Sequence, residues 1–487
     1  METGKLNPEP RPVRRSLGEG GTLTPRQMKT TDVIIIGGGP GGYVAALKSA
    51  MLGASVTLIE RDAVGGTCLN RGCIPTKTYL HNAEIIHHIH QAASRGILLA
   101  DANFTIDLAK AVATKNAVVT PLVAGIKGLL RSRKVALVAG NATLINKNQV
   151  QVGEETYEAT KGIILATGSS PARPPIKGID LPNVLTSDEM LNLTEMPKEL
   201  VIIGAGVIGI EMAQIFSAYN VKVTVVEAEQ TITPFIDAEC ATVLRALLEK
   251  RGITFLTGQK VMEIASRKQG LSVLLASGEP LSASHVLVAV GRKPNVEALG
   301  ALAIEKERGF IRANAQMQTS ASGVYAVGDV TGKSMLAHAA AKMGEVAAEN
   351  IMGHVASFDG MAVPGCIYGS PEVGWIGMTE AQAKEKIGEI KVSRFPFAAN
   401  GRAKCAGQSD GFIKIVSEPK HQAILGVHIV GPLASELINE AVALRAAEVT
   451  CEEWADMIHA HPTHAETMME AAAGVLDRCL HLPPAKG

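Results

Sequence analysis

A glycine-rich motif that occurs twice in the same arrangement is the feature that most constrains the fold of this 487-residue chain. Each copy begins with a short β-branched run, passes through G-x-G-x-x-G into a helical pattern, and ends in a second strand closed by a glutamate. The first glycine and the glutamate are 23 positions apart in both copies, from Gly37 to Glu60 and from Gly204 to Glu227. The repeat therefore predicts two βαβ units that each bind a dinucleotide with its pyrophosphate at a helix N-terminus.

Each glycine of the motif, and the acid that closes it, has a physical role. The first glycine permits a tight turn, the second lets the backbone approach the pyrophosphate, and the third lets the helix pack closely on the strand. The terminal acid can bind both hydroxyls of a ribose. The predicted binding residues are Gly37, Gly39, Gly42 and Glu60 in the first unit and Gly204, Gly206, Gly209 and Glu227 in the second.

Two cysteines follow the first unit in the stretch Gly-Gly-Thr-Cys-Leu-Asn-Arg-Gly-Cys-Ile-Pro-Thr-Lys, residues 65–77. Regular helix would separate the Cα atoms of Cys68 and Cys73 by roughly 8 Å, whereas a disulfide tolerates no more than about 7 Å. A bond between them therefore requires the chain to leave regular helix, and Gly72 supplies that freedom. The spacing alone fits either a redox-active pair or two structural thiols.

The position of the cysteines indicates which dinucleotide each unit binds. Cys68 lies eight residues after Glu60. A redox pair exchanges electrons only with a group that it touches, and a nicotinamide delivers a hydride to a flavin more readily than to a disulfide. We therefore expect FAD in the first unit and the nicotinamide nucleotide in the second. Because Glu227 is followed by no Lys or Arg to receive a 2′-phosphate, NAD is favoured over NADP.

The composition excludes several other classes of protein. Lys+Arg and Asp+Glu are balanced at 47 each and aromatic residues make up 3%, so we expect no nucleic acid or anionic membrane surface as partner. Seven scattered cysteines are typical of a reducing compartment, and the first 30 residues contain no apolar run, so we expect a cytoplasmic protein with a disordered tail rather than a transit peptide. Residues 33–59 carry only Lys48 as a charge, but their glycine cluster favours a buried strand-turn-helix over a membrane span.

Shorter signals complete the pattern. Residues 163–168 and 285–292 are predicted as buried strands ending in glycine, and residues 324–329 as a strand ending in Asp329; residues 187–193 are predicted as a turn. After residue 361, strand-like runs at 392–397, 412–416 and 424–430 precede helices from Glu436 onward. The predicted fold class is thus α/β, with two Rossmann-like dinucleotide-binding domains and an α+β C-terminal domain.

A histidine cluster near the C-terminus, His459-Ala-His-Pro-Thr-His-Ala-Glu466, is the last chemical feature. A histidine paired with a carboxylate can act as a base, and the reduction of a disulfide by a dithiol needs such a base to generate the attacking thiolate. Three histidines also suggest metal ligands, but Pro462 interrupts the helical spacing that a metal motif would use. We therefore expect no metal site.

Together, the 65–77 stretch, Gly328-Asp329 and the terminal His-Pro-Thr-x-x-Glu resemble the flavin-dependent pyridine nucleotide-disulfide oxidoreductases, from residue 31 to the C-terminus. The similarity is strongest to members that oxidise dihydrolipoamide. It implies a homodimer that binds FAD and NAD and serves lipoyl-bearing subunits of 2-oxo acid dehydrogenase or glycine cleavage complexes. The corresponding domains would be a tail at 1–30, the first part of the FAD-binding domain at 31–160 and an NAD-binding domain at 161–285. Residues 286–360 would form the second FAD-binding part, which is also the central region, and residues 361–487 the interface (dimerisation) domain.

The resemblance also implies a role for individual residues. Cys68 would be the thiol that meets the dithiol substrate, and Cys73 would make the charge-transfer contact with the flavin. His461, oriented by Glu466, would be the base and would reach the active site of the other subunit. Lys77, paired with Glu211, would lie near the flavin N5. Further cofactor contacts would come from Ala166, Thr167, Gly168, Gly291, Gly328 and Asp329.

The sequence also distinguishes this chain from related groups. Val207 stands where glutathione-type reductases carry a Tyr, Cys479 stands alone where mercuric reductases have a pair, and His464 replaces the more usual Leu, which we expect to change the local packing or pKa. The tail is too short for a lipoyl domain, so any lipoyl group should come from a partner.

Two other functions remain as alternatives. One is an NADPH-dependent disulfide or metal-ion reductase, and the other, from a different class, is a flavoprotein that mainly organises partner subunits.

Overall fold

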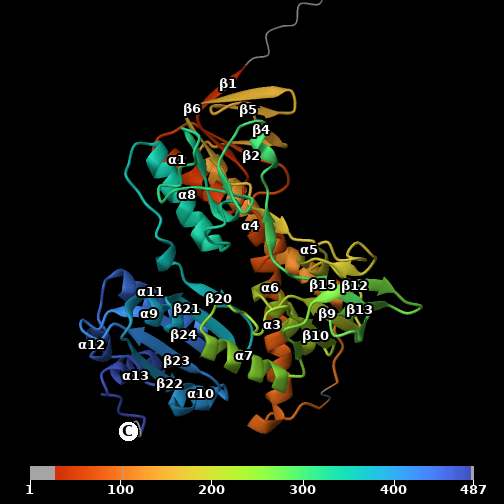
Figure 1. Ribbon diagram of the computed structural model, residues 1–487, viewed down its shortest axis with the longest axis vertical. Helices are drawn as coiled ribbons and strands as arrows, with labels where there is room; N and C mark the ends of the chain where they lie inside the picture. The colour runs from red at the N-terminus through yellow and green to blue at the C-terminus, as the bar shows by residue number, and fades with distance from the viewer. Residues whose placement is uncertain (1–27, 101–102, 484–487) are drawn as a thin grey trace, which may run out of the picture.

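The computed structural model describes residues 28–100 and 103–483. The three largest sheets, each with its own helices, form an upper lobe and two lower lobes (Figure 1). The upper lobe holds the first glycine motif, one lower lobe holds the second, and the other contains the C-terminal part of the chain. The predicted α/β fold class with an α+β C-terminal domain is confirmed.

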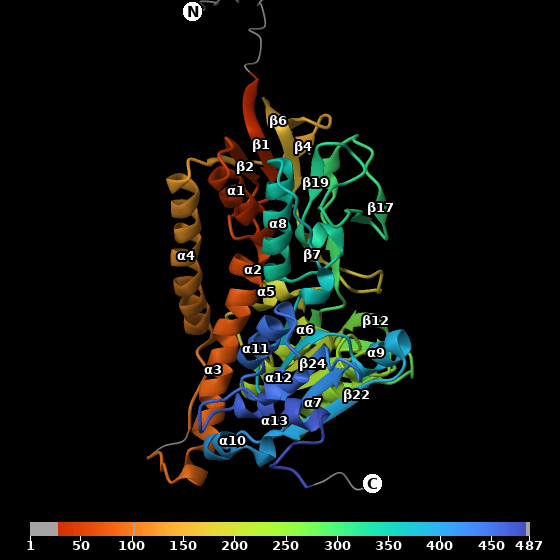
Figure 2. The same cartoon turned by 90° about the vertical axis from the view of Figure 1, so that its left-hand side faces the viewer.

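The upper sheet is built around the first glycine motif. Its strand order is β3-β2-β1-β6-β5-β4, and β19 pairs in parallel with the far end of β6, so residues near 325 return to a sheet begun near residue 30. Its strands are β1 (Lys29–Ile36), β2 (Val56–Glu60), β3 (Ala136–Ala139), β4 (Ala142–Leu144), β5 (Gln149–Val152), β6 (Glu155–Leu165) and β19 (Val324–Ala326). Helices α1 (Pro40–Met51) and α8 (Ala337–Ile351) pack together on this sheet (Figure 2).

The second glycine motif lies in a parallel sheet of order β11-β10-β9-β15-β8. Its central strand is β9, which is buried because helix α6 covers it. The elements of this lobe are β8 (Val184–Leu185), α5 (Ser187–Met190), β9 (Glu199–Ile203), α6 (Val207–Ala218), β10 (Lys222–Val226), α7 (Ala238–Lys250), β11 (Thr254–Leu256) and β15 (His285–Val288), with an antiparallel sheet of β12 (Val261–Ser266), β13 (Leu271–Leu275) and β14 (Pro280–Ala283).

The C-terminal lobe is a five-stranded antiparallel sheet of order β20-β21-β24-β23-β22, with helices packed on it. Trp454, Phe397 and Met468 lie in its buried core. The elements are β20 (Gly365–Ile367), β21 (Glu372–Gly377), α9 (Glu380–Ile387), β22 (Lys391–Pro396), α10 (Gly401–Ala406), β23 (Phe412–Ser417), β24 (Ile424–Gly431), α11 (Ala434–Ala446), α12 (Cys451–Ala455) and α13 (Glu466–Val475).

Helices between the first two sheets carry the cysteines. Helix α2 (Gly66–Arg71) leads into the long α3 (Cys73–Gln91), which runs from the upper lobe down beside the lower ones, and α4 (Leu108–Ser132) follows it (Figure 2). The remaining short strands form two pairs. These are β7 (Ser169–Pro171) with β16 (Arg292–Pro294), and β17 (Lys306–Glu307) with β18 (Phe310–Ile311).

Two details differ from the sequence prediction. Strand β1 begins at Lys29, inside the predicted tail, because Lys29–Thr31 pair with β6 and Lys29 forms an ion pair with Glu155; the rest of that tail, residues 1–27, lies outside the described residues. Residues 187–190 form helix α5 rather than a turn, because Thr186 and Glu189 make a capping box. The domain limits stay predictions; the boundary at 160/161 falls inside β6 and the boundary at 285/286 falls inside β15.

Among the described residues, no helix combines the length and apolarity needed to cross a membrane. The apolar stretch at 33–59 contains all of α1 and most of β1 and β2, and most of its hydrophobic side chains pack in the core of the upper lobe.

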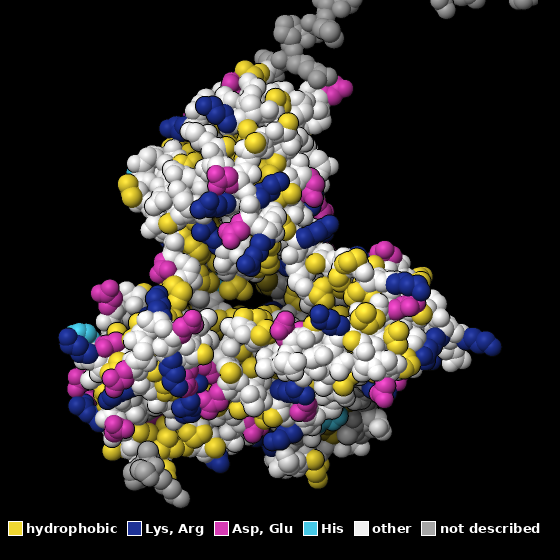
Figure 3. All heavy atoms as spheres, in the orientation of Figure 1, with side chains coloured by type: hydrophobic (Ala, Val, Ile, Leu, Met, Phe, Trp, Pro, Cys, Tyr) yellow, Lys and Arg dark blue, Asp and Glu magenta, His cyan; other side chains and the backbone are white. Residues whose placement is uncertain are grey.

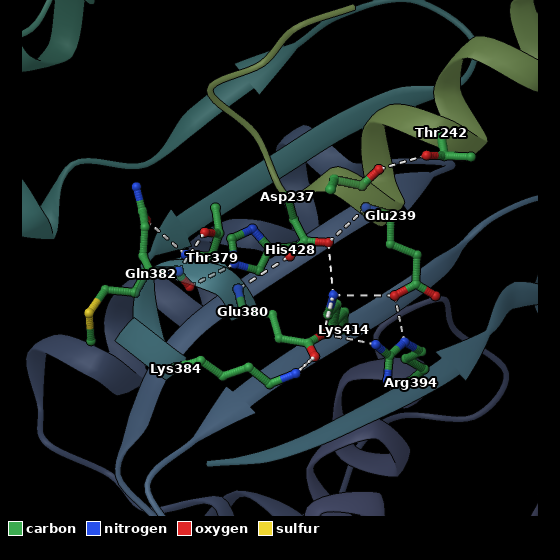
Figure 4. Close-up of polar contacts among 12 residues, drawn as sticks. Asp237, Glu239, Thr242, Thr379, Glu380, Gln382, Lys384, Arg394, Lys414 and His428 are labelled. Carbon is green, nitrogen blue, oxygen red and sulfur yellow. Dashed lines mark hydrogen bonds and ion pairs between the residues drawn. The ribbon is translucent and has the colours of Figure 1, made fainter. Parts of the chain in front are cut away.

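A buried ion cluster joins the second lobe to the C-terminal lobe (Figure 4). The ammonium of Lys414, on β23, lies 2.9 Å from Asp237, 3.2 Å from Glu239 and 2.7 Å from Glu380. Arg394, on β22, binds Glu239 and Glu380 at 2.6 and 2.9 Å. Asp237 and Glu239 stand at the N-terminus of α7 in the second lobe, so the cluster fixes that lobe against the C-terminal sheet.

Removal of the central cation should destabilise the protein. The side chains of Lys414 and Asp237 are both only 3% exposed, and breaking a buried pair by deleting one partner costs about 3–5 kcal/mol. We therefore expect Lys414→Met to lower the free energy of unfolding by that amount in urea denaturation. Lys384→Met is the matched control, because Lys384 also binds Glu380 but is 59% exposed, and such surface pairs contribute only about 0–1 kcal/mol. Equal losses in both variants would contradict the role of the cluster.

Candidate active site

A large cavity of about 1930 Å³ lies where the three lobes meet. The surface is hollowed there, between the upper lobe and the two lower ones (Figure 3). Ligand pockets in proteins usually measure roughly 300–1,000 Å³, so this cavity has room for two large ligands. Both glycine motifs and both cysteines line it.

The second glycine of each motif leaves open the space that a ligand would use. A Cβ added at Gly206 would meet no atom within 4 Å, and one at Gly39 would meet only the Cα of Gly66 at 3.8 Å. Both glycines are N-caps without a side-chain cap, so the first N–H groups of α1 and α6 face the cavity without such a partner. A Cβ at Gly42 or Gly209, by contrast, would overlap a backbone carbonyl oxygen. The four glycines thus form two cradles that fit pyrophosphate groups.

The glutamates that close the second strands occupy equivalent positions. Glu60 accepts hydrogen bonds from the backbone N–H groups of Gly38, at 2.5 Å, and Asp62, at 2.8 Å. Glu227 accepts from Ala205, at 2.7 Å, and Glu229, at 2.9 Å. Both carboxylates are therefore held at the edge of a cradle, where a ribose would lie.

Residues at the ends of β6 and β19 complete the wall of the first cradle. The Thr167 hydroxyl donates to the Asn295 carbonyl at 2.6 Å, and the Asn295 amide donates to the Thr167 carbonyl at 3.0 Å, which holds the loop 166–168 in place. Asp329 accepts from the Ser169 hydroxyl at 2.5 Å and lies 3.8 Å from Arg292. Ala166, Gly168, Gly291 and Gly328 also line the cavity.

Asp188 is a cavity residue that sequence reasoning missed. Its Oδ1 atom is buried without a hydrogen-bond partner among the described residues, and burial raises the pKa of its carboxyl group although Arg71 and Arg292 are nearby. An orphaned acceptor of this kind fits a hydroxyl-rich ligand. Its position follows from helix α5, whose capping box (Thr-x-x-Glu at 186–189) was the available sequence signal.

The backbone between the two cysteines leaves regular helix, as a close approach of the thiols requires. Helix α2 ends at Arg71, Gly72 has φ −139° and ψ −110°, and α3 starts at Cys73. Cys68 and Cys73 are both free thiols in this structure, and each thiol shifts the pKa of the other.

The two thiols differ in acidity. The hydrogen bond from Cys68 lowers the pKa of Cys73, and the positive charge of Lys77 lowers it further against the effect of burial. The same hydrogen bond, together with burial, raises the pKa of Cys68. When the pair is reduced, the thiolate therefore forms at Cys73.

Lys77 and Glu211 meet across the junction of two lobes. Lys77, on α3, donates to both carboxylate oxygens of Glu211, on α6, at 2.9 and 2.8 Å. The Glu211 side chain is 5% exposed and that of Lys77 is 29% exposed. The ion pair therefore fixes an ammonium group inside the cavity, four residues after Cys73 on the same helix.

The histidine cluster lies elsewhere. His461 Nδ1 is 2.8 Å from a carboxylate oxygen of Glu466, but the His461 side chain is 79% exposed, and neither residue lines the cavity. His459 instead pairs with Glu440, and His464 is buried against Phe397 with its Nε2 unpartnered, while burial lowers its pKa. Within one chain, the structure thus forms the His–Glu pair without bringing it to the cysteines.

Two nucleotide cradles that open into one cavity with a thiol pair define a disulfide oxidoreductase of the two-dinucleotide class. Family models agree, because one described as pyridine nucleotide-disulphide oxidoreductase matches residues 31–344, and its dimerisation domain matches residues 363–472. The chain belongs to the pyridine nucleotide-disulphide oxidoreductase family. The family implies bound FAD and NAD(P), and the dimerisation domain implies a homodimer.

Individual relatives cover nearly the whole chain. The dihydrolipoyl dehydrogenase of Thermus scotoductus is 43% identical over 93% of this chain and 99% of its own length. The mitochondrial dihydrolipoyl dehydrogenase of Pisum sativum is 41% identical over 93% of this chain and 92% of its own. Among solved structures, LpdA from Mycobacterium tuberculosis superimposes with a TM-score of 0.84 at 28% identity, covering 91% of this chain and 99% of that one.

The open cradles provide a test of which unit binds which dinucleotide. Gly39 and Gly206 have φ values of −68° and −77°, which any residue adopts, so valine at either position should fold without strain and fill only ligand space. We expect Gly206→Val to raise the Kd for the nicotinamide nucleotide at least tenfold with flavin retained, and Gly39→Val to lose the flavin. Flavin absorbance measures the flavin content of each variant, and nucleotide titration measures the Kd. Loss of flavin from the Gly206 variant would contradict the assignment of the flavin to the first unit.

Proposed function

We propose that this chain is an NAD-dependent dihydrolipoyl dehydrogenase, which oxidises protein-bound dihydrolipoamide to lipoamide. The observation that carries the proposal is the Cys68–Cys73 thiol pair, which faces the same cavity as two dinucleotide cradles and has its more acidic thiol beside Lys77. This arrangement suits dithiol chemistry coupled to a nucleotide. Relatives with this activity cover 93% of the chain at about 40% identity.

FAD is held by the first unit and NAD by the second. Gly39, Glu60 and Asp329 hold the first dinucleotide, and the Asp188 Oδ1 atom, which has no hydrogen-bond partner among the described residues, offers a further acceptor. Gly206 and Glu227 hold the second dinucleotide. The Glu227 carboxylate repels a 2′-phosphate, which favours NAD over NADP. Bound FAD supplies a two-electron carrier between the thiols and NAD. The proposed domains remain 31–160 and 286–360 for FAD, 161–285 for NAD and 361–487 for the interface.

The protein's thiols exchange with the substrate in two steps. In the oxidised state, a thiolate of the dihydrolipoyl group attacks the Cys68 sulfur of the Cys68–Cys73 disulfide, and Cys73 leaves as a thiolate. The second substrate thiol then attacks the substrate sulfur of this mixed disulfide, which closes the lipoyl ring and releases Cys68. Because Cys73 is the more acidic thiol, it is the better leaving group. The substrate loses two electrons and two protons, and the cysteine pair gains the electrons.

His461 takes up a proton from the substrate thiol. Glu466 binds its Nδ1 at 2.8 Å and so leaves Nε2 free to act as the acceptor. Since His461 lies on an exposed part of the dimerisation domain and outside the cavity of its own chain, it serves the cavity of the second copy. Each active site of the dimer then combines cysteines from one subunit with a base from the other.

The proposed partners are lipoyl-bearing subunits of 2-oxo acid dehydrogenase or glycine cleavage complexes, because a lipoyl group on a flexible arm can reach a thiol pair inside a cavity.

A steady-state assay with dihydrolipoamide tests the proposal directly. We expect turnover with NAD to exceed that with NADP at least a hundredfold in kcat/KM, because Glu227 disfavours the extra phosphate. The assay follows NADH or NADPH formation at 340 nm with FAD-loaded dimer. If the protein does not oxidise dihydrolipoamide but reduces another disulfide with NADPH, it is instead the NADPH-dependent reductase named above as the alternative.

His461→Gln should slow the oxidation of dihydrolipoamide by a factor of about 10² to 10⁴, the usual contribution of a general base. Electron transfer from NADH to a dye should be unchanged, because it needs no base at the thiols. His481→Gln is the matched control, since His481 is also exposed and also bonded to a glutamate, Glu470, and it should be silent in both assays. Equal losses in the two assays would make His461 a structural residue.

A further inference from the structure

A tyrosine of the dimerisation domain completes the surroundings of the Lys77–Glu211 pair. The Tyr368 ring lies over the Lys77 ammonium, with 4.3 Å between Nζ and the ring centroid. This is within the range of a cation–π interaction, which strengthens when the charge is partly desolvated. Tyr368 also lines the cavity, and burial raises the pKa of its phenol to about 12, so the ring stays neutral.

The backbone of this segment is tied to helix α6 on both sides of the ring. The Tyr368 N–H donates to Glu211 at 3.1 Å, and its carbonyl accepts from the Gln214 amide at 3.1 Å. Gln214 in turn accepts from the Ser370 N–H at 2.8 Å. Glu211 and Gln214 lie one turn apart on α6, so the ring is placed by the same helix that supplies the counter-ion of Lys77.

The position of Lys77 matters for the cysteines. Cys73 and Lys77 are four residues apart on α3 and so share one face of the helix. The charged groups around Cys73 are Lys77, which favours its thiolate, and Glu211, which opposes it; Cys68 adds a hydrogen bond that also favours the thiolate. Small movements of the Lys77 ammonium therefore change the balance of charge at Cys73.

We propose that Tyr368 is a positioning residue of the redox centre, whose ring holds the Lys77 ammonium between itself and Glu211 so that Lys77 stabilises the Cys73 thiolate. The ring acts through Lys77 and takes no direct part in thiol exchange. The dimerisation domain thus contributes to the chemistry of its own chain as well as to the subunit contact. The proposal rests on the proposed function only in treating Cys73 as the thiolate of the redox pair.

The test titrates Cys73 in the FAD-loaded dimer. In a Cys68→Ser background, the rate of Cys73 alkylation by iodoacetamide is measured from pH 4 to 10, with the site confirmed by mass spectrometry, and the long-wavelength thiolate–flavin absorbance is followed in parallel. Tyr368→Phe keeps the aromatic face, whereas Tyr368→Leu and Tyr368→Met keep only apolar bulk. We expect the apparent pKa of Cys73 to be unchanged in the Phe variant and to rise by about 0.5 to 1 in the other two, which slows alkylation about three- to tenfold below the pKa.

A double-mutant cycle with Lys77→Gln shows whether the ring acts through the ammonium. The difference between the Phe and Leu variants should vanish once the charge is gone. Identical pKa values in the Phe, Leu and Met variants, or a difference that persists without Lys77, would overturn the proposal and reduce Tyr368 to a packing residue. The titration uses neither dihydrolipoamide nor NAD, so the two proposals can fail separately. If the pKa shift is observed but dihydrolipoamide is not oxidised, the proposed substrate is wrong and the role of Tyr368 still holds.

Discussion

The ion pair between Lys77 and Glu211 is the interaction on which the arrangement of the site depends. It joins the helix that carries Cys73 to the helix that follows the second glycine motif. Tyr368 adds a third contact from the C-terminal lobe, through both its ring and its backbone N–H. One small cluster therefore sets the position of three separately folded parts of the chain around the thiols.

The Lys414 cluster makes another connection between the second lobe and the C-terminal lobe. Asp237 caps helix α7 in that lobe and binds a lysine buried in the C-terminal sheet. Because burial of charges is costly unless they are paired, the second lobe has a strong preference for one orientation. Its glycine motif therefore faces the cavity that the first lobe also lines.

Much of the fold could be predicted because its information is local. The spacing of the glycines and of Glu60 and Glu227 reflects the geometry of one βαβ unit. The strands at 392–396, 412–417 and 424–431 follow from short runs rich in β-branched and aromatic residues. One prediction was wrong for the opposite reason: Lys29 begins β1, inside the predicted tail, because a partner strand more than a hundred residues away pairs with it. The turn predicted at 187–193 was wrong although its signal, the capping box of Thr186 and Glu189, is local. Asp188 was missed because its place in the cavity depends on how the lobes pack together.

The sequence by itself determined the two dinucleotide units, the close-spaced cysteines, and a histidine with a neighbouring acid, because each is encoded within a few residues or one supersecondary unit. Only the tertiary structure decided which thiol is the more acidic, since that depends on Lys77, Glu211 and burial. It also decided that Tyr368 covers Lys77 and that His461 lies outside the cavity of its own chain. These properties arise from distances between residues far apart in the chain, and electrostatic and aromatic interactions depend on those distances rather than on sequence separation.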